Sequence, residues 1–461
     1  MKAKLPILIG VASMFVACSQ QEMVDSVMMD GDSHRAVIES INTDSEFSLV
    51  VSVEEASTIA KRDLSYSKSR MRSSVNDTYS ITTYKDGGRD IFYIINYDRG
   101  GFKLISATKV LNPVLAFSDT GKFNGFDIPD GVDIWISQIS DEIKYRESLS
   151  KDSLFKTVDV WNTVLTSPAV IKRATPIDPD DESEGLQRID DAMMQAIDEG
   201  AVRFYKAGEQ FCEDSQLCEE TWANAKLCVC EELKPRWESF CFVAKFETER
   251  IVDVPNFIET QWGQNNRFNM YYPDDEPAGC VPVAFGQLMY YYKYPTSYNW
   301  DGMDTYWGNQ YSARLLRDIA IAAKTQNGGT FRENGLNALK SFGYLLSYFD
   351  ANIIYSVIPY INRKKPVVMY GKEQGSVDGH AWLATGYKES TKGNEYKLYY
   401  VESPMADIYP EYVQYFQTIS DRFIYMNWGW NGSDNGYYRS TVTNSNRVFS
   451  LTNILVAEPN K

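Results

Sequence analysis

Hydrophobic and polar positions in the first part of the chain predict a small unit of helix and sheet. Residues 52–55 have the form of a capping box, and apolar positions at helical spacing follow it. Strand-like runs at 91–96 and 102–106 flank Asp98-Arg99-Gly100-Gly101, which is a hairpin pattern, and a third strand is expected at 113–117. This block is therefore expected to fold as a small α+β unit.

In the last part of the chain, helical patterns come first and strand patterns follow. Helices are expected from Cys280 to the break at Tyr294-Pro295, around 315–323 and around 336–342. Strands are expected from Pro366 onward, at 380–386, 397–401 and 422–428, with a last run ending near Val456. Helices followed by antiparallel strands predict an α+β domain with a cleft between its halves.

The region between these parts carries a cysteine cluster. An acidic, proline-containing stretch at 175–185 predicts an exposed linker, and an amphipathic helix is expected from Leu186 to Gly200. Five of the seven cysteines follow, namely Cys212, Cys218, Cys228, Cys230 and Cys241. They predict disulfides and not a zinc site, because no histidine and no Cys-x-x-Cys pair accompanies them. One thiol is left over, and whether it is free, intermolecular or transiently paired with Cys280 stays open.

The N-terminus has the pattern of an export signal. Lys2 and Lys4 precede an apolar stretch at 5–17, which is too short to span a bilayer. The small residues before Cys18 resemble a bacterial lipobox, which implies cleavage there and a lipid on the Cys18 sulfur. The chain is then expected to be exported, as a lipoprotein anchored to the outer membrane or cell surface, or secreted after processing.

Composition narrows the function classes. With 461 residues, 44% of them hydrophobic, the chain has room for two or three packed units. A formal net charge of −16 argues against a nucleic-acid partner, because phosphate binding needs clustered Lys and Arg. We expect no metal and no cofactor.

Cys280 is the first candidate for chemistry. Gly279 permits a sharp turn before it, and Pro282 is tolerated only in a first helical turn. The unpaired N–H groups and the positive end of the helix dipole favour a thiolate at this position. The alternative is that Cys280 is a small core residue, as most single cysteines are.

A base for this thiol would have to be His380, because the chain has only two histidines and His34 lies in a polar N-terminal segment. Further on, the Asn427 side chain could accept the far ring N–H of His380, while the Trp428 indole covers the pair from water. The alternatives are a satisfied core histidine and a tight aromatic hairpin. The chain order Cys, His, Asn is typical of papain-like thiol proteases.

Four sequence blocks, in their order along the chain, resemble the streptopain family of bacterial cysteine peptidases. The blocks are Trp262-Gly263-Gln264, Gly279-Cys280-Val281 through Tyr294-Pro295, Gly379-His380-Ala381-Trp382 and Asn427-Trp428-Gly429-Trp430-Asn431-Gly432. The resemblance implies a two-lobed papain-like catalytic domain, with a helical lobe and an antiparallel sheet lobe. In it Cys280 is the nucleophile, His380 the proton acceptor and donor, and Gln264 the oxyanion side chain, while Asn427 and Trp428 orient and shield the histidine. Gly379 leaves its backbone to bind an extended substrate.

The strand-like runs before residue 121 are similar to the streptopain propeptide, which implies an intramolecular inhibitor; the alternative is a small binding domain. The predicted boundaries are a signal peptide at 1–18, a tether at 19–45, a small α+β prodomain at 46–150, a connector at 151–245 and a peptidase domain at 246–461. The expected partners are polypeptide substrates, the prodomain and a membrane.

The function predicted is therefore a cysteine endopeptidase made as an autoinhibited zymogen. Cell-wall peptide amidase or transpeptidase chemistry on the same scaffold, and a non-catalytic surface-binding lipoprotein, are the alternatives. The sequence departs from the family by an insertion around 402–420 and by a shortened glycine stretch at 327–330. Substrate specificity is left undetermined by these departures.

Overall fold

The structure is a computed structural model, and it describes residues 48–61, 78–149, 157–158, 160–161, 165, 184–212, 215–229, 231, 233–350, 354–372, 379–402, 408, 411–439 and 451–460. The predicted signal peptide, the lipidation site Cys18, the tether and Cys230 lie outside these ranges. Most of the acidic stretch at 175–185 also lies outside them.

Twelve strands form one sheet in which every described pairing is antiparallel. The strands are β1 Tyr79–Asp86, β2 Arg89–Tyr97, β3 Phe102–Ser106, β4 Val114–Ser118, β5 Ala201–Lys206, β6 Cys241–Val254, β7 Tyr344–Asp350, β8 Val367–Lys372, β9 Gly379–Tyr400, β10 Glu411–Asn427, β11 Gly436–Arg439 and β12 Leu451–Pro459. Their order is β1-β2-β3-β4-β11-β10-β9-β8-β12-β7, and β6 pairs with β5 and β9. The predicted class, mixed helix with antiparallel sheet, is confirmed.

The first part of the chain forms β1 to β4 with two helices, α2 (Val53–Ala60) and α3 (Asp130–Glu147). The capping box is present, since the Ser52 hydroxyl accepts from the Glu55 N–H and the Glu55 carboxylate accepts from the Ser52 N–H. The expected hairpin is β2–β3, and β4 is the expected third strand. Strand β4 also pairs with β11 of the last part, so one continuous sheet joins the two parts.

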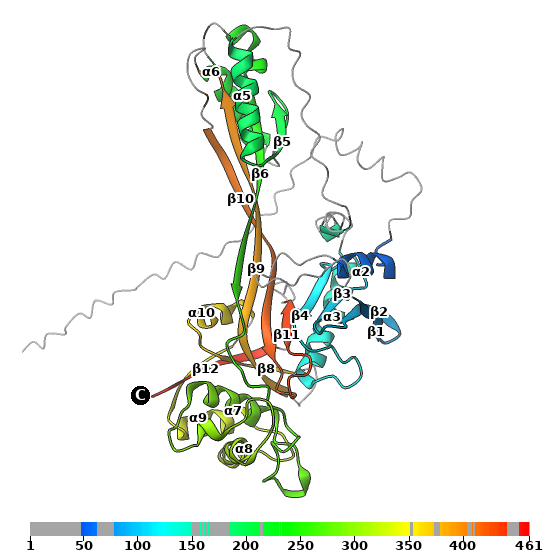
Figure 1. Ribbon diagram of the computed structural model, residues 1–461, viewed down its shortest axis with the longest axis vertical. Coiled ribbons are helices and arrows are strands. Elements are labelled where there is room, and N and C mark those ends of the chain that lie inside the picture. The colour runs from blue at the N-terminus through cyan, green and yellow to red at the C-terminus, as the bar shows by residue number, and fades with distance from the viewer. Residues whose placement is uncertain are drawn as a thin grey trace, which may run out of the picture. The chain divides into compact units, whose positions relative to one another are not determined.

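A layer of helices packs against the other part of the sheet (Figure 1). It contains α7 (Cys280–Tyr292), α8 (Gln310–Ala322) and α9 (Arg332–Ser341), which are the three predicted helices, with the short α10 (Ile358–Ile361) elsewhere on the sheet. The 3-10 helices are Lys234–Phe240, Pro273–Asp275, Trp300–Gly302 and Ile354–Val357. No helix among the described residues is both long and apolar enough to span a membrane.

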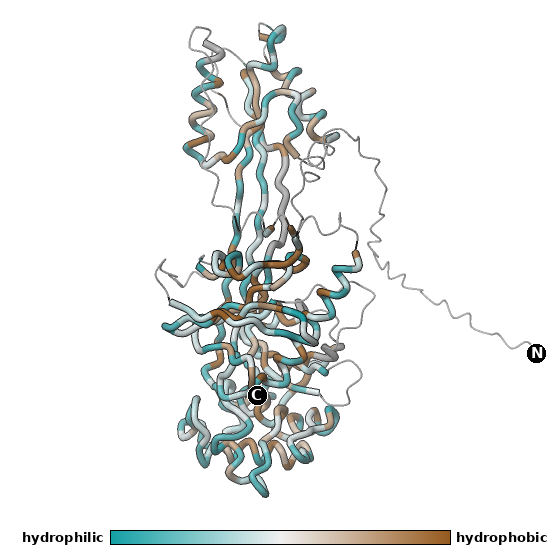
Figure 2. The backbone as a smooth tube through the Cα atoms, turned by 90° about the vertical axis from the view of Figure 1, so that its right-hand side faces the viewer, coloured by the Kyte–Doolittle hydropathy of each residue, from teal (hydrophilic) through white to brown (hydrophobic). Residues whose placement is uncertain are grey.

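Strand β9 departs from the sequence prediction. The two strands expected at 380–386 and 397–401 are one strand of 22 residues, which spans about 70 Å at the usual rise. Its middle is polar on both faces, so alternation of hydrophobic residues is lost there, but β6 and β10 satisfy its backbone along that length. Figure 2 shows the middle of β6 and β9, two strands of this three-stranded ribbon, mostly in teal and white.

A distal lobe is built at the far end of the ribbon from α5 (Glu184–Asp198), β5, α6 (Ser215–Cys228) and the ends of β6 and β9 (Figure 1). Ile189 of the predicted amphipathic helix is buried there against Phe242 and Tyr399. The boundary expected at 245–246 falls inside β6, so the connector and the following part share a strand.

The cysteines of the distal lobe have different surroundings. Cys228 is exposed, Cys241 is buried with its thiol directed at the Trp237 carbonyl, and Cys218 is buried in α6. The sulfurs of Cys212 and Cys218 lie 3.3 Å apart, which is longer than the S–S bond of about 2.05 Å but in direct contact. The predicted disulfides stay a prediction, and this contact favours Cys212–Cys218 as one pair.

We expect an oxidised sample to carry that pair within one peptide. Trypsin cuts after Lys and Arg, so Cys212 and Cys218 fall together in the peptide of residues 207–226. Cys228 and Cys230 fall in the peptide 227–236, and Cys241 falls in the peptide 237–245. Peptide 207–226 should be lighter by two hydrogen atoms and resist alkylation until it is reduced, as measured by mass spectrometry. In the Cys212→Ser variant, Cys218 should alkylate; a cross-link between two different peptides through Cys218 would contradict the pairing.

Candidate active site

Cys280 stands at the N-terminus of α7, as predicted. The preceding residue, Gly279, has φ of 90°, a region that favours glycine. A Cβ on Gly279 would lie 2.6 Å from the Gly328 carbonyl oxygen, so the turn has no room for a side chain. The thiol is therefore placed at the positive end of the helix by a turn that requires glycine.

His380, at the start of β9, lies against this sulfur, and the neighbouring Ala381 N–H donates to it. Burial is the largest single influence on the Cys280 thiol and raises its pKa. The charge of the His380 ring, its hydrogen bond to the sulfur and the Ala381 N–H together outweigh burial and lower that pKa below its ordinary value. The geometry therefore favours a thiolate paired with an imidazolium.

The His380 ring is buried, with 2% of the residue exposed. Its Nε2 lies 3.2 Å from the Trp428 carbonyl oxygen and donates to it when the ring is protonated, while Nδ1 lies 3.5 Å from the Asp130 Oδ2. Burial lowers the pKa of His380, but the Cys280 thiolate and the Asp130 carboxylate together raise it to about 10. The histidine is thus held as a cation between two anions.

The position of Asn427 corrects a sequence-based expectation. Its side chain does not reach His380, because the Oδ1 accepts from the Gly429 N–H at 3.2 Å and from Gln287 Nε2 at 3.3 Å. The partner of the far ring nitrogen is instead the backbone carbonyl of Trp428. The Trp428 indole lies within the same cluster and donates to the Asp434 carbonyl at 3.0 Å.

Gln264 and Gly379 lie at the edges of this arrangement. Gln264 is buried, and its carbonyl accepts from the Ala278 N–H at 2.8 Å, which ties its segment to the turn before Cys280. Gly379 is exposed and lies opposite Lys372 in the β8–β9 ladder, so a neighbouring strand already lies beside its backbone. The oxyanion and substrate roles expected for them stay predictions.

The first turn of α3 supplies the residues that the sequence reasoning missed. The carboxyl group of Asp130 approaches His380, and the ring lowers the pKa of Asp130 below its ordinary value, although burial opposes this effect. A Cβ on Gly131 would come within 2.5 Å of the Trp428 indole and 3.0 Å of the His380 ring. Helix α3 had a detectable signal, the helical spacing of Val132, Trp135, Ile136, Ile139 and Ile143 after Pro129.

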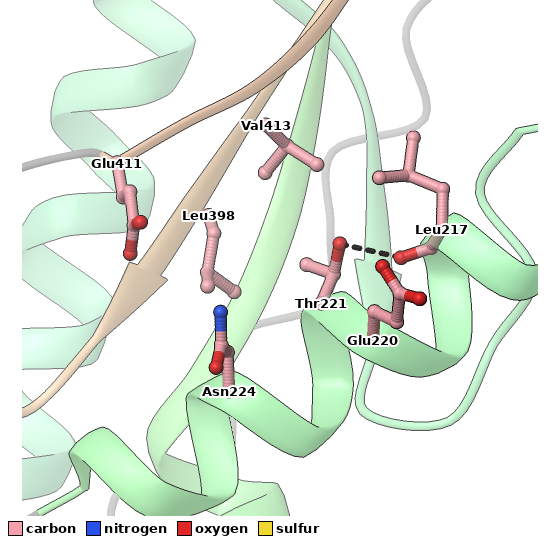
Figure 3. Close-up of a pocket in the computed structure, with 7 residues that line it drawn as sticks. All are labelled: Leu217, Glu220, Thr221, Asn224, Leu398, Glu411 and Val413. Atoms are coloured by element: carbon pink, nitrogen blue, oxygen red, sulfur yellow. Dashed lines mark hydrogen bonds between the residues drawn. The ribbon is translucent and has the colours of Figure 1, made fainter.

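A separate cavity of about 160 Å³ lies in the distal lobe (Figure 3). It is lined by residues of α6, β9 and β10, which are Leu217, Glu220, Thr221, Asn224, Leu398, Glu411 and Val413. Leu398 is 18 positions beyond His380 along β9, or about 60 Å. The cavity is therefore distinct from the cysteine site. Among the described residues, no group of three or more His, Cys, Asp or Glu is arranged to hold a metal ion.

Comparison with known proteins gives a family match for the first part of the chain. Residues 48–143 match the family model of the Spi protease inhibitors, so this part of the chain resembles a protease-inhibitor domain. This range contains α3 and therefore Asp130 and Gly131. No curated protein matches the chain.

Among solved structures, a fragment of prointerpain A from Prevotella intermedia aligns with 82% of this chain and 98% of its own length, at 16% sequence identity and a TM-score of 0.43.

We expect the Cys280 thiolate to persist at a pH below the ordinary cysteine pKa of about 8.5, because its pKa is lowered by His380. The His380→Ala variant removes that charge and leaves burial, so the titration should move to higher pH. Thiolate absorbance in the ultraviolet, taken as the difference between each protein and its Cys280→Ser counterpart, isolates this group from the other cysteines. An unchanged titration in His380→Ala would mean that the two groups are not paired.

Proposed function

We propose that the chain is the zymogen of a cysteine endopeptidase, inhibited by its own residues 48–143. The observation that carries the proposal is the contact of Asp130 and Gly131, in the part that matches a protease-inhibitor family, with the His380 and Trp428 side chains beside Cys280. A binding domain unrelated to the thiol would have no reason to place a carboxylate and a helix end there.

The chemistry proposed is peptide-bond hydrolysis through a thioester. The Cys280 thiolate attacks the carbonyl carbon of the substrate, and the carbonyl oxygen becomes negatively charged. The N–H of Cys280, at an unpaired helix N-terminus, and the Gln264 amide are the donors proposed for that oxygen.

His380 moves the protons in this scheme. It gives its proton to the leaving amine, which releases the first product and leaves the acyl group on the Cys280 sulfur. As a neutral base it then takes a proton from water, which attacks the thioester carbon. The carbon–sulfur bond breaks, the acyl group leaves as a carboxylic acid, and the thiolate–imidazolium pair is restored. The Trp428 carbonyl, as acceptor for Nε2, restricts the orientation of the ring beside the sulfur.

Autoinhibition is proposed to act on this proton transfer and on access to the site. Asp130 occupies the Nδ1 side of His380, where the leaving amine must come to collect its proton. Helix α3 is held there by a shared hydrophobic core, in which Val132 and Ile136 pack with Met369 and Trp382. Activation must therefore separate a buried interface as well as cleave the chain.

The remaining elements of the proposal rest on the sequence. The four motif blocks favour a streptopain-like peptidase with a papain-like division into a helical lobe and a sheet lobe. The lipobox-like Cys18 favours export and lipid anchoring. Polypeptides are the proposed substrates.

Cys280→Ala should abolish casein cleavage and leave the chain as an unprocessed precursor, because no other group supplies the nucleophile. Cys228→Ser, which changes an exposed cysteine of the distal lobe, is the matched control and should process normally. Both are followed by gel electrophoresis and by release of labelled casein peptides. Casein cleavage by purified Cys280→Ala would end the proposal.

The Asp130→Asn and Gly131→Ala variants should process themselves faster than the wild type. Asp130→Asn removes the charge that pairs with His380, and Gly131→Ala forces a methyl group into the Trp428 indole. The matched control is Asp141→Asn, an exposed position on the same helix. Slower or unchanged processing in both variants would show that this helix end does not inhibit.

The Asp130–His380 pair also gives a pH dependence with a defined sign. The pKa of Asp130 is lowered, so the stabilisation that its carboxylate gives to the inhibited state is present above the ordinary value of about 3.9. That stabilisation is lost as the pH falls through the lowered pKa. The pKa of His380 is raised to about 10, so its contribution is lost only as the pH rises through that value. Acid should therefore speed processing more in the wild type than in Asp130→Asn, and the difference isolates Asp130 from other acids such as Asp434.

A further inference from the structure

Gln287 is a fully buried amide in the middle of the apolar helix α7. It follows Cys280 by seven positions, which is close to two helical turns, so the two residues share one face of the helix. Its neighbours Phe285, Leu288 and Met289 are buried hydrophobic side chains. A buried amide costs stability unless its hydrogen bonds are made, so its partners indicate its role.

Both ends of the Gln287 amide are bonded to Asn427. Its Nε2 donates to Asn427 Oδ1 at 3.3 Å, and its Oε1 accepts from Asn427 Nδ2 at 3.1 Å. The Oε1 also accepts from the Trp262 N–H at 3.2 Å. Two amides that bond each other in both directions fix each other's orientation, and each is also bonded to backbone.

Asn427 extends this network to the turn that carries the histidine's acceptor. Its Nδ2 donates to the Thr260 carbonyl at 2.8 Å, and its Oδ1 accepts from the Gly429 N–H at 3.2 Å. The residue between Asn427 and Gly429 is Trp428, whose carbonyl lies 3.2 Å from His380 Nε2. The Asn427 side chain therefore acts on His380 only through the backbone.

The same network reaches the proposed oxyanion donor. Trp262, bonded to Gln287, is two positions before Gln264. Among the described side chains, Gln287 alone lies on the helix of Cys280 and hydrogen-bonds both Trp262, which leads to Gln264, and Asn427, which precedes Trp428.

We propose that Gln287 is a positioning residue. Through the Asn427 amide it holds the Trp428 carbonyl in register with Cys280, and through the Trp262 N–H it holds the segment leading to Gln264. The inference rests on the proposed peptidase function and adds to it a residue that touches neither substrate nor the reacting atoms. Without the Gln287 amide, the 427–429 turn and the 260–262 segment stay linked by the Asn427–Thr260 bond but lose their hydrogen bonds to α7. The orientation of the His380 ring relative to the sulfur is then less restricted.

The test compares Gln287→Leu, of similar size but without hydrogen bonds, with the matched control Leu288→Ala. Leu288 is the next residue on α7, is fully buried in the hydrophobic core of that helix, and has no side-chain group that can hydrogen-bond to the amides. Shortening it destabilises the same helix by a cavity. Both variants are made in the full chain, processed in trans with wild-type enzyme, and assayed as folded protein at a temperature below both unfolding midpoints.

We expect Gln287→Leu to lower kcat by about tenfold to a hundredfold with a small change in KM. The acid limb of the pH–activity profile should move to higher pH, because the thiolate loses its aligned imidazolium. Gln287→Glu keeps the acceptor for Trp262 and Asn427 Nδ2, and should retain more kcat than Gln287→Leu. Leu288→Ala should lower Tm while keeping the wild-type kcat and pH profile.

A second readout does not depend on peptidase activity. The ultraviolet titration of the Cys280 thiolate should shift to higher pH in Gln287→Leu and not in Leu288→Ala. If the wild type cleaves no peptide but this shift is observed, the proposed function fails and the positioning role stands. If the wild type is active and Gln287→Leu keeps its kcat, pH profile and thiolate titration, the positioning role is overturned.

Discussion

The pairing of the Cys280 thiolate with the His380 imidazolium is the interaction on which the rest of the site depends. A charge in a buried position is costly unless an opposite charge and hydrogen bonds accompany it. Here each group changes the pKa of the other in the direction that maintains both charges. The pair exists only because α7 packs against the first residues of β9, which brings together two segments separated by 100 positions.

Asp130 adds a second anion beside the same imidazolium, and the sheet explains how it arrives there. The pairing of β4 with β11 makes the first and last parts of the chain edges of one sheet, and α3 lies over that junction with its side chains in the common core. The Asn124 N–H donates to the Asp434 carboxylate at 2.7 Å, which fastens the segment leading into α3. In the proposed zymogen, inhibition therefore depends on a shared core and sheet that hold Asp130 beside His380.

In the proposed positioning role, the neutral amides restrict the orientation of the His380 ring, which charge attraction alone does not fix. Electrostatic attraction between Cys280 and His380 acts over a range of directions, whereas proton transfer needs a defined ring orientation. The Gln287–Asn427 pair restricts the turn that carries the Trp428 carbonyl, and the indole of Trp428 lies 5.2 Å, between ring centroids, from Trp382. The buried aromatic and amide groups thereby keep water from the cationic ring.

In the distal lobe, hydrophobic cores and backbone hydrogen bonds support different stretches of the same strands. Its two small cores, around Ile189 and around Trp222, lie on the ends of long strands whose middle has little hydrophobic support. Backbone hydrogen bonds along β6, β9 and β10 are what continue the sheet through that polar middle. The strand period in the sequence is weak there because the middle of β9 is polar on both faces, including the buried Ser390 and Thr391.

The sequence by itself determined the local features: the capping box at Ser52, the β2–β3 hairpin, the helix that begins at Cys280 and the restriction of the base to His380. Each depends on residue types within a few positions or on a count of histidines. Only the tertiary structure decided that a backbone carbonyl of Trp428, and not the Asn427 side chain, faces His380, and that Asp130 lies on the other side of the ring. A backbone carbonyl carries no residue-type signature, and a contact between residues 130 and 380 follows from how strands pair and cores merge, which no local pattern encodes.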